Sequence, residues 1–260
     1  MRPNGENVGG KAKAQGAPDA PPLPLISPQW LAANLAEPSL RIFDVSVALS
    51  ADDETGALKA ESGQAAYEQG HIPGAAFLNL GDLEDPARQD LHMLPAAKAV
   101  AAVMSGAGVG PGTHVIAYDT GAAMWATRLW WMLRVFGFES VSVLDGGLRA
   151  WAESGFPLST DPPVYPSARF EARFRPELVL SIDEVAAQVE GERGCLVNGL
   201  TPEIFRGGKL RSATAAPGEF QAASTSPTSP CLTPRPAASF LPPGYANSYR
   251  VQASSMRGDR

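Results

Sequence analysis

The stretch His114-Val-Ile-Ala-Tyr118, with residues 122–135 and Val141-Ser-Val-Leu144 that follow it, decides the fold class of this chain. Its first and last segments are short apolar runs of the kind found in buried strands. The segment between them has large apolar side chains at helical spacing, namely Trp125, Leu129, Met132 and Phe136. A strand, a helix and a second strand in this order predict an α/β unit with parallel strands.

The same alternation continues on both sides of this unit. Ser27 and Pro28 are typical of an N-cap followed by the first residue of a helix. The sequence therefore predicts an α/β domain with a central parallel sheet flanked by helices. The further elements that we expect are a helix at 29–35, strands at 41–47 and 75–78, and helices at 95–105 and 148–153.

Composition excludes several classes of function. The net charge is −6 and no basic stripe is present, so we expect no nucleic-acid partner. No apolar run approaches the roughly 18 residues of a membrane-spanning helix, and the N-terminus lacks the apolar region of a secretory signal. Two cysteines provide neither a disulfide framework nor a CxxC metal site. We expect a cytoplasmic monomer without metal or cofactor.

Composition also divides the chain. Residues 1–24 are rich in Gly, Ala and Pro, and we predict that they are disordered. Prolines crowd residues 157–176, and we assign 161–178 to an interdomain linker. The periodic pattern then restarts. Ser181-Ile-Asp-Glu184 is a capping box, and a strand at 195–198 and a helical turn from Thr201 follow it. This order repeats that of residues 27–44 and indicates an internal duplication.

The pattern breaks near Arg211. The 49 residues 212–260 contain only six large aliphatic residues or phenylalanines, too few to offset the entropy of ordering the segment. We predict that 212–260 is disordered. When its codons are read one base out of frame, permitted synonymous choices encode an Arg-Ile-Pro-Gly-Ser motif, which answers His71-Ile-Pro-Gly-Ala75. We therefore hypothesise that the coding sequence shifts frame between about Gly207 and Ser212.

Six motifs in order resemble tandem rhodanese-type sulfurtransferases of the thiosulfate or 3-mercaptopyruvate class, over about residues 25–211. The resemblance implies a rhodanese-like, non-catalytic first domain at 25–160 and the start of a second at 179–211. The motifs are Tyr67-Glu-Gln-Gly-His-Ile-Pro-Gly-Ala75, His92-Met-Leu-Pro95, Val115-Ile-Ala-Tyr-Asp119, Arg128-Leu-Trp-Trp-Met-Leu-Arg134, Ser142-Val-Leu-Asp-Gly-Gly-Leu148 and Phe205-Arg-Gly207.

The resemblance also implies a mechanism. In this family the second repeat has a six-residue loop headed by a cysteine, which accepts sulfane sulfur as a persulfide and passes it to a thiophilic acceptor. Backbone N–H groups that point into such a loop stabilise a thiolate. Asp119 occupies the equivalent position of the first repeat, and a carboxylate cannot carry sulfane sulfur. We therefore assign no catalytic residue to the first domain.

Neither cysteine has the surroundings of a nucleophile. Cys195 lies in an apolar strand and is interpreted as a small buried hydrophobe. Cys231 lies in a Ser-Pro-Cys-Leu-Thr-Pro context that lacks the glycines of a strand–loop–helix turn. We expect this chain to have little or no sulfurtransferase activity. The alternative is a non-catalytic rhodanese domain that acts as a protein-interaction module.

Three residues are candidates for binding a small sulfur-containing substrate. Arg206 matches the arginine of the family's Phe-Arg-Gly motif, whose planar fork suits a carboxylate or thiosulfonate. Arg128 precedes the paired tryptophans, and its alternative is a structural ion pair. His71 matches a position near the family's active-site cleft, and its alternative is a turn residue that holds the strand entry. The glycine-rich segment 106–112 precedes a strand instead of following one, so we exclude a dinucleotide or phosphate role.

Overall fold

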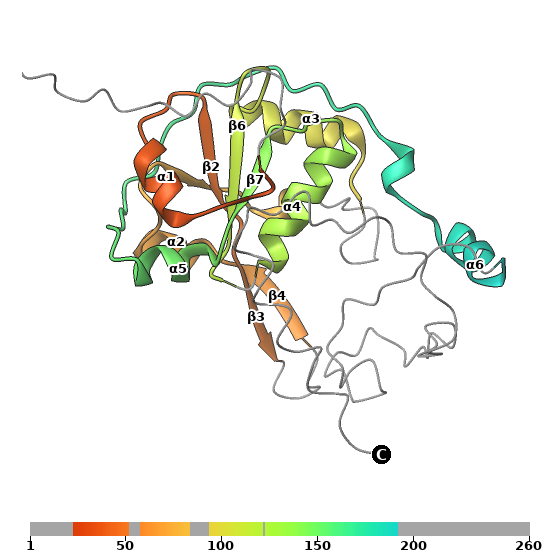
Figure 1. The fold of residues 1–260 in the computed structure, drawn as a ribbon, viewed down its shortest axis with the longest axis horizontal. Helices are drawn as coiled ribbons and strands as arrows, with labels where there is room; N and C mark the ends of the chain where they lie inside the picture. The colour runs from red at the N-terminus through yellow and green to blue at the C-terminus, as the bar shows by residue number, and fades with distance from the viewer. Residues whose placement is uncertain (1–22, 52–57, 84–93, 122, 192–260) are drawn as a thin grey trace, which may run out of the picture. The chain divides into compact units, whose positions relative to one another are not determined.

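A computed structural model describes residues 23–51, 58–83, 94–121 and 123–191. Its centre is a five-stranded sheet in the order β1-β7-β6-β2-β5, in which all neighbouring strands are parallel (Figure 1). These strands are β1 (Leu25–Ile26), β2 (Leu40–Asp44), β5 (Ala75–Phe77), β6 (His114–Tyr118) and β7 (Val141–Leu144). The predicted α/β fold with a central parallel sheet is confirmed.

A separate antiparallel hairpin is formed by β3 (Val47–Ala51) and β4 (Leu58–Ser62). The helices of the described residues are α1 (Pro28–Asn34), α2 (Gln64–Gln69), α3 (Ala97–Gly106), α4 (Met124–Val135), α5 (Gly147–Glu153) and α6 (Ile182–Glu190), with short 3-10 turns η1 (Leu80–Leu83) and η2 (Pro176–Leu178).

The sheet is buried on both faces, because successive side chains of a strand point to opposite sides. In β6, Val115 and Ala117 join a cluster with the apolar residues of α3 and α4. The alternate residues Ile116 and Tyr118 join a second cluster with Leu31 of α1 and Trp151 of α5. This two-sided burial explains why β6 and β7 are continuous apolar runs and not alternating ones.

Local rules account for the ends of the elements. The Ser27 hydroxyl accepts a hydrogen bond from the Trp30 N–H at 3.1 Å, which confirms the predicted N-cap. Strand β2 ends at Asp44 instead of continuing to residue 47, because Asp44 Oδ1 accepts the Ser46 N–H at 2.9 Å and turns the chain. Helix α4 begins two residues later than predicted, because Ala123 has a left-handed φ of 58°.

The proline-rich segment packs onto the domain as a strap, defined here as residues 157–179. Phe170 is 5% exposed and belongs to the cluster under α3 and α4. The Ala168 N–H donates to Ser105 O at 2.9 Å. Gly108 has a φ of +76°, and a Cβ there would lie 2.7 Å from Pro166 O. The glycine-rich segment 106–112 therefore makes room for the strap.

The chain divides into two compact units at Val179–Leu180. In the second unit, Ser181 and Glu184 form the predicted capping box: the Ser181 N–H donates to Glu184 Oε2 at 2.7 Å, and the Glu184 N–H donates to Ser181 Oγ at 3.2 Å. The other predictions for the second unit, namely the strand at 195–198, the turn from Thr201 and the tail 212–260, lie outside the described residues. The same holds for residues 1–22.

Candidate functional site at the Asp119 loop

The candidate site lies where β6 ends. Open α/β sheets bind ligands beyond the carboxyl ends of their strands, and Asp119 is the first residue after β6. The loop that it begins leads directly into α4. Asp119 is nevertheless 1% exposed, so its carboxylate belongs to the interior of the domain.

Four backbone N–H groups surround this carboxylate. Oδ1 accepts from Gly121 at 2.9 Å and from Ala123 at 3.0 Å. Oδ2 accepts from Trp125 at 3.1 Å and from Ala126 at 3.3 Å, at the N-terminal end of α4. Such N–H groups and the positive end of a helix dipole favour an anion. The loop is thus an anion cradle, and the group that occupies it is the chain's own side chain.

The turn after β7 holds the backbone of the same residue. The Leu148 N–H donates to Asp119 O at 2.9 Å. Gly147 has a φ of +59°, and a Cβ there would lie 2.3 Å from Asp119 O, so only glycine permits this approach. The Gly146-Gly147 segment therefore positions the first residue of the loop.

A second buried carboxylate lies at the end of the neighbouring strand. Asp44 is 1% exposed, and its burial raises its pKa above the ordinary 3.8, with a smaller contribution from the negative charge of Asp119. Hydrogen bonds from Ser46 and Tyr118 oppose this rise. Burial, together with the charge of Asp44, raises the pKa of the Tyr118 hydroxyl as well. Sequence reasoning missed both residues, although an aspartate inside a predicted buried strand was a usable signal for Asp44.

His71 is fully buried and holds chain segments together. Its ring stacks on Tyr67 with centroids 3.9 Å apart. Nδ1 lies 3.0 Å from Tyr67 O, and Nε2 lies 3.2 Å from Asp161 O in the strap. Its backbone N–H donates to Ser159 O at 2.9 Å and its carbonyl accepts from the Ser159 N–H at 2.8 Å. This geometry matches the alternative of a residue that holds the strand entry, while substrate binding stays a prediction.

The other predicted substrate residues are distributed differently. Arg128 lies half-buried on α4, the helix that begins at the Asp119 loop. Arg206 lies outside the described residues, as do Cys195 and Cys231. Asp119, in the loop after β6, and Arg128, on α4, thus lie on adjacent parts of the chain. His71 is connected to this region through Ile72, whose N–H donates to the Tyr118 hydroxyl at 3.3 Å.

The chemistry available in the described ranges is limited. They contain no cysteine, and no group of three or more His, Cys, Asp or Glu side chains within them could hold a metal ion. One serine–histidine pair occurs there: Ser142 Oγ lies 2.9 Å from His114 Nε2. This serine is fully buried and donates to Leu23 O at 2.6 Å, so it anchors the segment before β1 and is not a nucleophile. In the same ranges, no helix is both long enough and apolar enough to cross a membrane.

Comparison with known proteins agrees with this architecture. The family model of the rhodanese-like domain matches residues 27–154. This match confirms a rhodanese-like domain at these residues, while the tandem arrangement that the sequence suggested stays a prediction. A crystal structure of SseA from Escherichia coli, described as a 3-mercaptopyruvate sulfotransferase with a rhodanese fold, is 32% identical. The match has a TM-score of 0.59 and covers 66% of this chain and 64% of that one.

Relatives of known sequence carry sulfurtransferase names. Thiosulfate/3-mercaptopyruvate sulfurtransferase 2 of Arabidopsis thaliana is 32% identical over 76% of this chain and 65% of its own length. The 3-mercaptopyruvate sulfurtransferase of Escherichia coli K12 is 35% identical over 62% of this chain and 55% of its own length. The match thus spans somewhat more than half the length of these relatives.

Proposed function

We propose that this chain is a sulfurtransferase-family protein of the thiosulfate or 3-mercaptopyruvate class, and that its rhodanese-like domain is the non-catalytic repeat. The observation that carries this proposal is the Asp119 carboxylate, which fills the anion cradle with four N–H contacts of 2.9–3.3 Å. A persulfide requires a thiolate sulfur as nucleophile. The carboxylate offers no sulfur, and it also blocks the cradle to another anion.

We extend the proposal to the whole chain, which we expect to transfer little or no sulfur. Both cysteines, Cys195 and Cys231, have sequence surroundings that do not resemble a cysteine-headed loop. The frame-shift hypothesis offers a cause, since it removes the rest of a second repeat after about residue 211. Arg206, the candidate substrate-binding arginine of that repeat, would remain without its nucleophile. Arg128 and His71 stay the candidates in the first domain.

A turnover assay tests this function. The full chain is supplied with thiosulfate and cyanide, or with 3-mercaptopyruvate and a thiol, and thiocyanate or sulfide is measured. We expect rates at the level of a protein-free blank, and the same rates for Cys195→Ser and Cys231→Ser. Turnover that one of these two variants abolishes would refute the proposal and identify the nucleophile.

The second candidate is a non-catalytic interaction module. It is favoured by the filled cradle, which holds the chain's own carboxylate, and by the strap, whose Phe170 packs into the core cluster of the domain. A partner whose binding is reproduced with two purified components, without any sulfur transfer, would support the module. Sulfur transfer that depends on the partner would support the enzyme family's chemistry instead.

Cellular location, oligomeric state and ligand class are also proposals, based on composition and on the names of relatives. We propose a cytoplasmic monomer whose ligands are small sulfur compounds, as the names of the relatives suggest. The acidic charge of −6 supports the absence of a nucleic-acid partner. Size-exclusion chromatography with light scattering tests the monomer, and a dimer mass would contradict it.

A further inference from the structure

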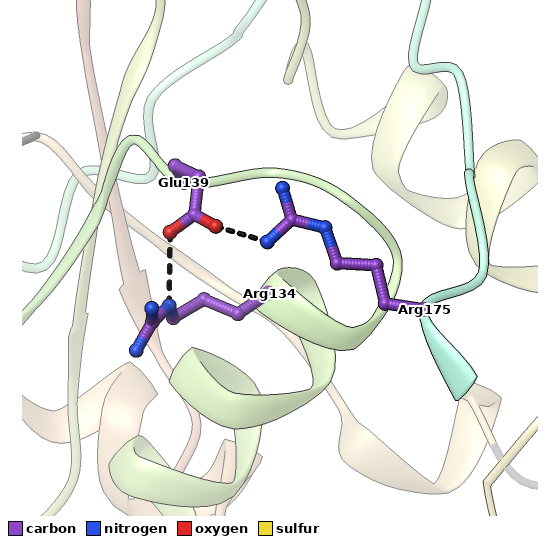
Figure 2. A network of polar contacts seen from close by, with 3 residues as sticks. All are labelled: Arg134, Glu139 and Arg175. Atoms are coloured by element: carbon purple, nitrogen blue, oxygen red, sulfur yellow. Dashed lines mark hydrogen bonds and ion pairs between the residues drawn. The ribbon is translucent and has the colours of Figure 1, made fainter. Parts of the chain in front are cut away.

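At the C-terminal end of the strap, the carboxylate of Glu139 pairs with two arginines, one of the domain and one of the strap. Glu139 lies in the turn between α4 and β7. Its Oε2 accepts from Arg134 Nε at 2.9 Å, and its Oε1 accepts from Arg175 Nη1 of the strap (Figure 2). Arg134 is held in place by stacking over the Trp130 ring, with 4.7 Å between the guanidinium carbon and the ring centroid.

The strap backbone follows the same turn closely. The Arg173 N–H donates to Phe136 O at 2.9 Å, and the Arg175 N–H donates to Val135 O at 2.8 Å. Gly137 has a φ of +83°, and a Cβ there would lie 3.1 Å from Arg173 O. Two strap amides thus report directly on whether this end of the strap is docked.

The middle of the strap and its C-terminal end are held by different interactions. Its middle is fixed by the buried Phe170 and by Tyr165, whose hydroxyl accepts from the Ile42 N–H at 3.1 Å and donates to Gly74 O. Near its end, Phe174 is 52% exposed and Leu178 is 39% exposed. The partly buried Val179 packs against the core cluster and the Phe174 ring lies 6.0 Å from that of Phe136, so apolar burial there is smaller than at Phe170. At this end the Arg175 side chain adds a charge-assisted hydrogen bond to the two backbone hydrogen bonds, and such bonds are stronger than neutral ones.

We propose that Glu139 is a latch for residues 173–179: it holds the end of the strap on the domain, and its loss lets this end open while the core stays folded. Local opening of weakly attached segments at a small fraction of the global unfolding free energy is a general property of proteins. The latch fixes the point at which the chain leaves the first unit after Val179. It requires no ligand and is independent of the sulfur chemistry proposed above.

Hydrogen exchange of the full chain tests the latch. In Glu139→Gln we expect the Arg173 and Arg175 amides to exchange about fivefold faster or more, as expected for losing a half-exposed double ion pair. Amides of β6 should keep their wild-type rates. Arg175→Lys, which keeps the charge, should show a smaller increase than Glu139→Gln.

Glu153→Gln is the matched control, because it makes the same chemical change in the exposed pair with Arg149, 4.0 Å away on α5. It should leave the two strap amides unchanged. Unchanged strap exchange in Glu139→Gln would overturn the latch. An equal acceleration across β6 and the strap would also overturn it, because Glu139 would then support the whole fold.

Discussion

At the scale of single residues, the Asp119 carboxylate and its four N–H donors connect the fold to the proposal that this domain is the non-catalytic repeat. The same contacts that leave no room for a sulfur group also satisfy amides at the start of α4 that would otherwise be buried without partners. The resemblance predicted which residue stands at this position. The burial of its side chain followed from the left-handed Ala123 and the close Gly147, which no periodicity reveals.

Replacing this carboxylate should destabilise the domain. Asp119→Ala leaves buried N–H groups unpaired, and we expect a loss of about 2–4 kcal/mol in the free energy of unfolding. Urea denaturation measures it. Asp119→Asn keeps one acceptor oxygen and should lose less. Asp82→Ala, at an exposed carboxylate of η1, is the control and should change stability by under about 0.5 kcal/mol. Equal effects at positions 82 and 119 would contradict the cradle.

The pKa of Asp44 gives a dependence on pH with a definite sign. Burial raises this pKa in the folded protein, so the folded state binds a proton more tightly than the unfolded state does. The resulting stability is fully present below the unfolded pKa near 3.8 and is lost as the pH rises through the folded pKa. Asp44→Asn removes this loss. Its unfolding free energy relative to wild type should therefore increase from pH 4 to pH 7 in urea titrations, and a decrease would contradict the raised pKa.

At the scale of elements, sequence periodicity predicted the centre of the sheet well and the strap poorly. The strands His114–Tyr118 and Val141–Leu144 were predicted residue for residue, because strands buried on both faces are continuous apolar runs. Predicted helix starts were early where Ala96 and Ala123 leave the helical region. The strap has five prolines and no periodicity between residues 157 and 176, and its contacts join residues far apart in the chain. Its docking therefore had no local signal.

Two phenylalanines of the strap provide a matched test of this docking. Phe170 is 5% exposed, whereas Phe174 is 52% exposed four residues later. We expect Phe170→Ala to cost about 3 kcal/mol or more in unfolding free energy, through lost burial and a cavity, and Phe174→Ala to cost less than about 1 kcal/mol. Thermal or urea unfolding compares the two. A cost for Phe170→Ala as small as that expected for Phe174→Ala would show that the strap is not part of the domain core.

At the scale of the whole molecule, the chain combines a self-contained rhodanese-like domain with a second unit that begins at Leu180. The capping box of α6 fits a restarted repeat, and the frame-shift hypothesis concerns residues beyond it. Sequencing the gene across the codons for Phe205–Ser212 should reveal an overlapping frame that continues the second repeat. A gene without such a frame would remove the proposed cause of inactivity.

We propose above that this chain cannot hold sulfane sulfur. The most direct measurement is the intact mass of the full chain after incubation with 3-mercaptopyruvate or thiosulfate and removal of the donor. We expect an unchanged mass, because Asp119 fills the cradle at the end of β6 and the sequence around neither cysteine resembles a cysteine-headed loop. A gain of one sulfur atom, mapped by peptide analysis to Cys195 or Cys231 and discharged by cyanide, would contradict it.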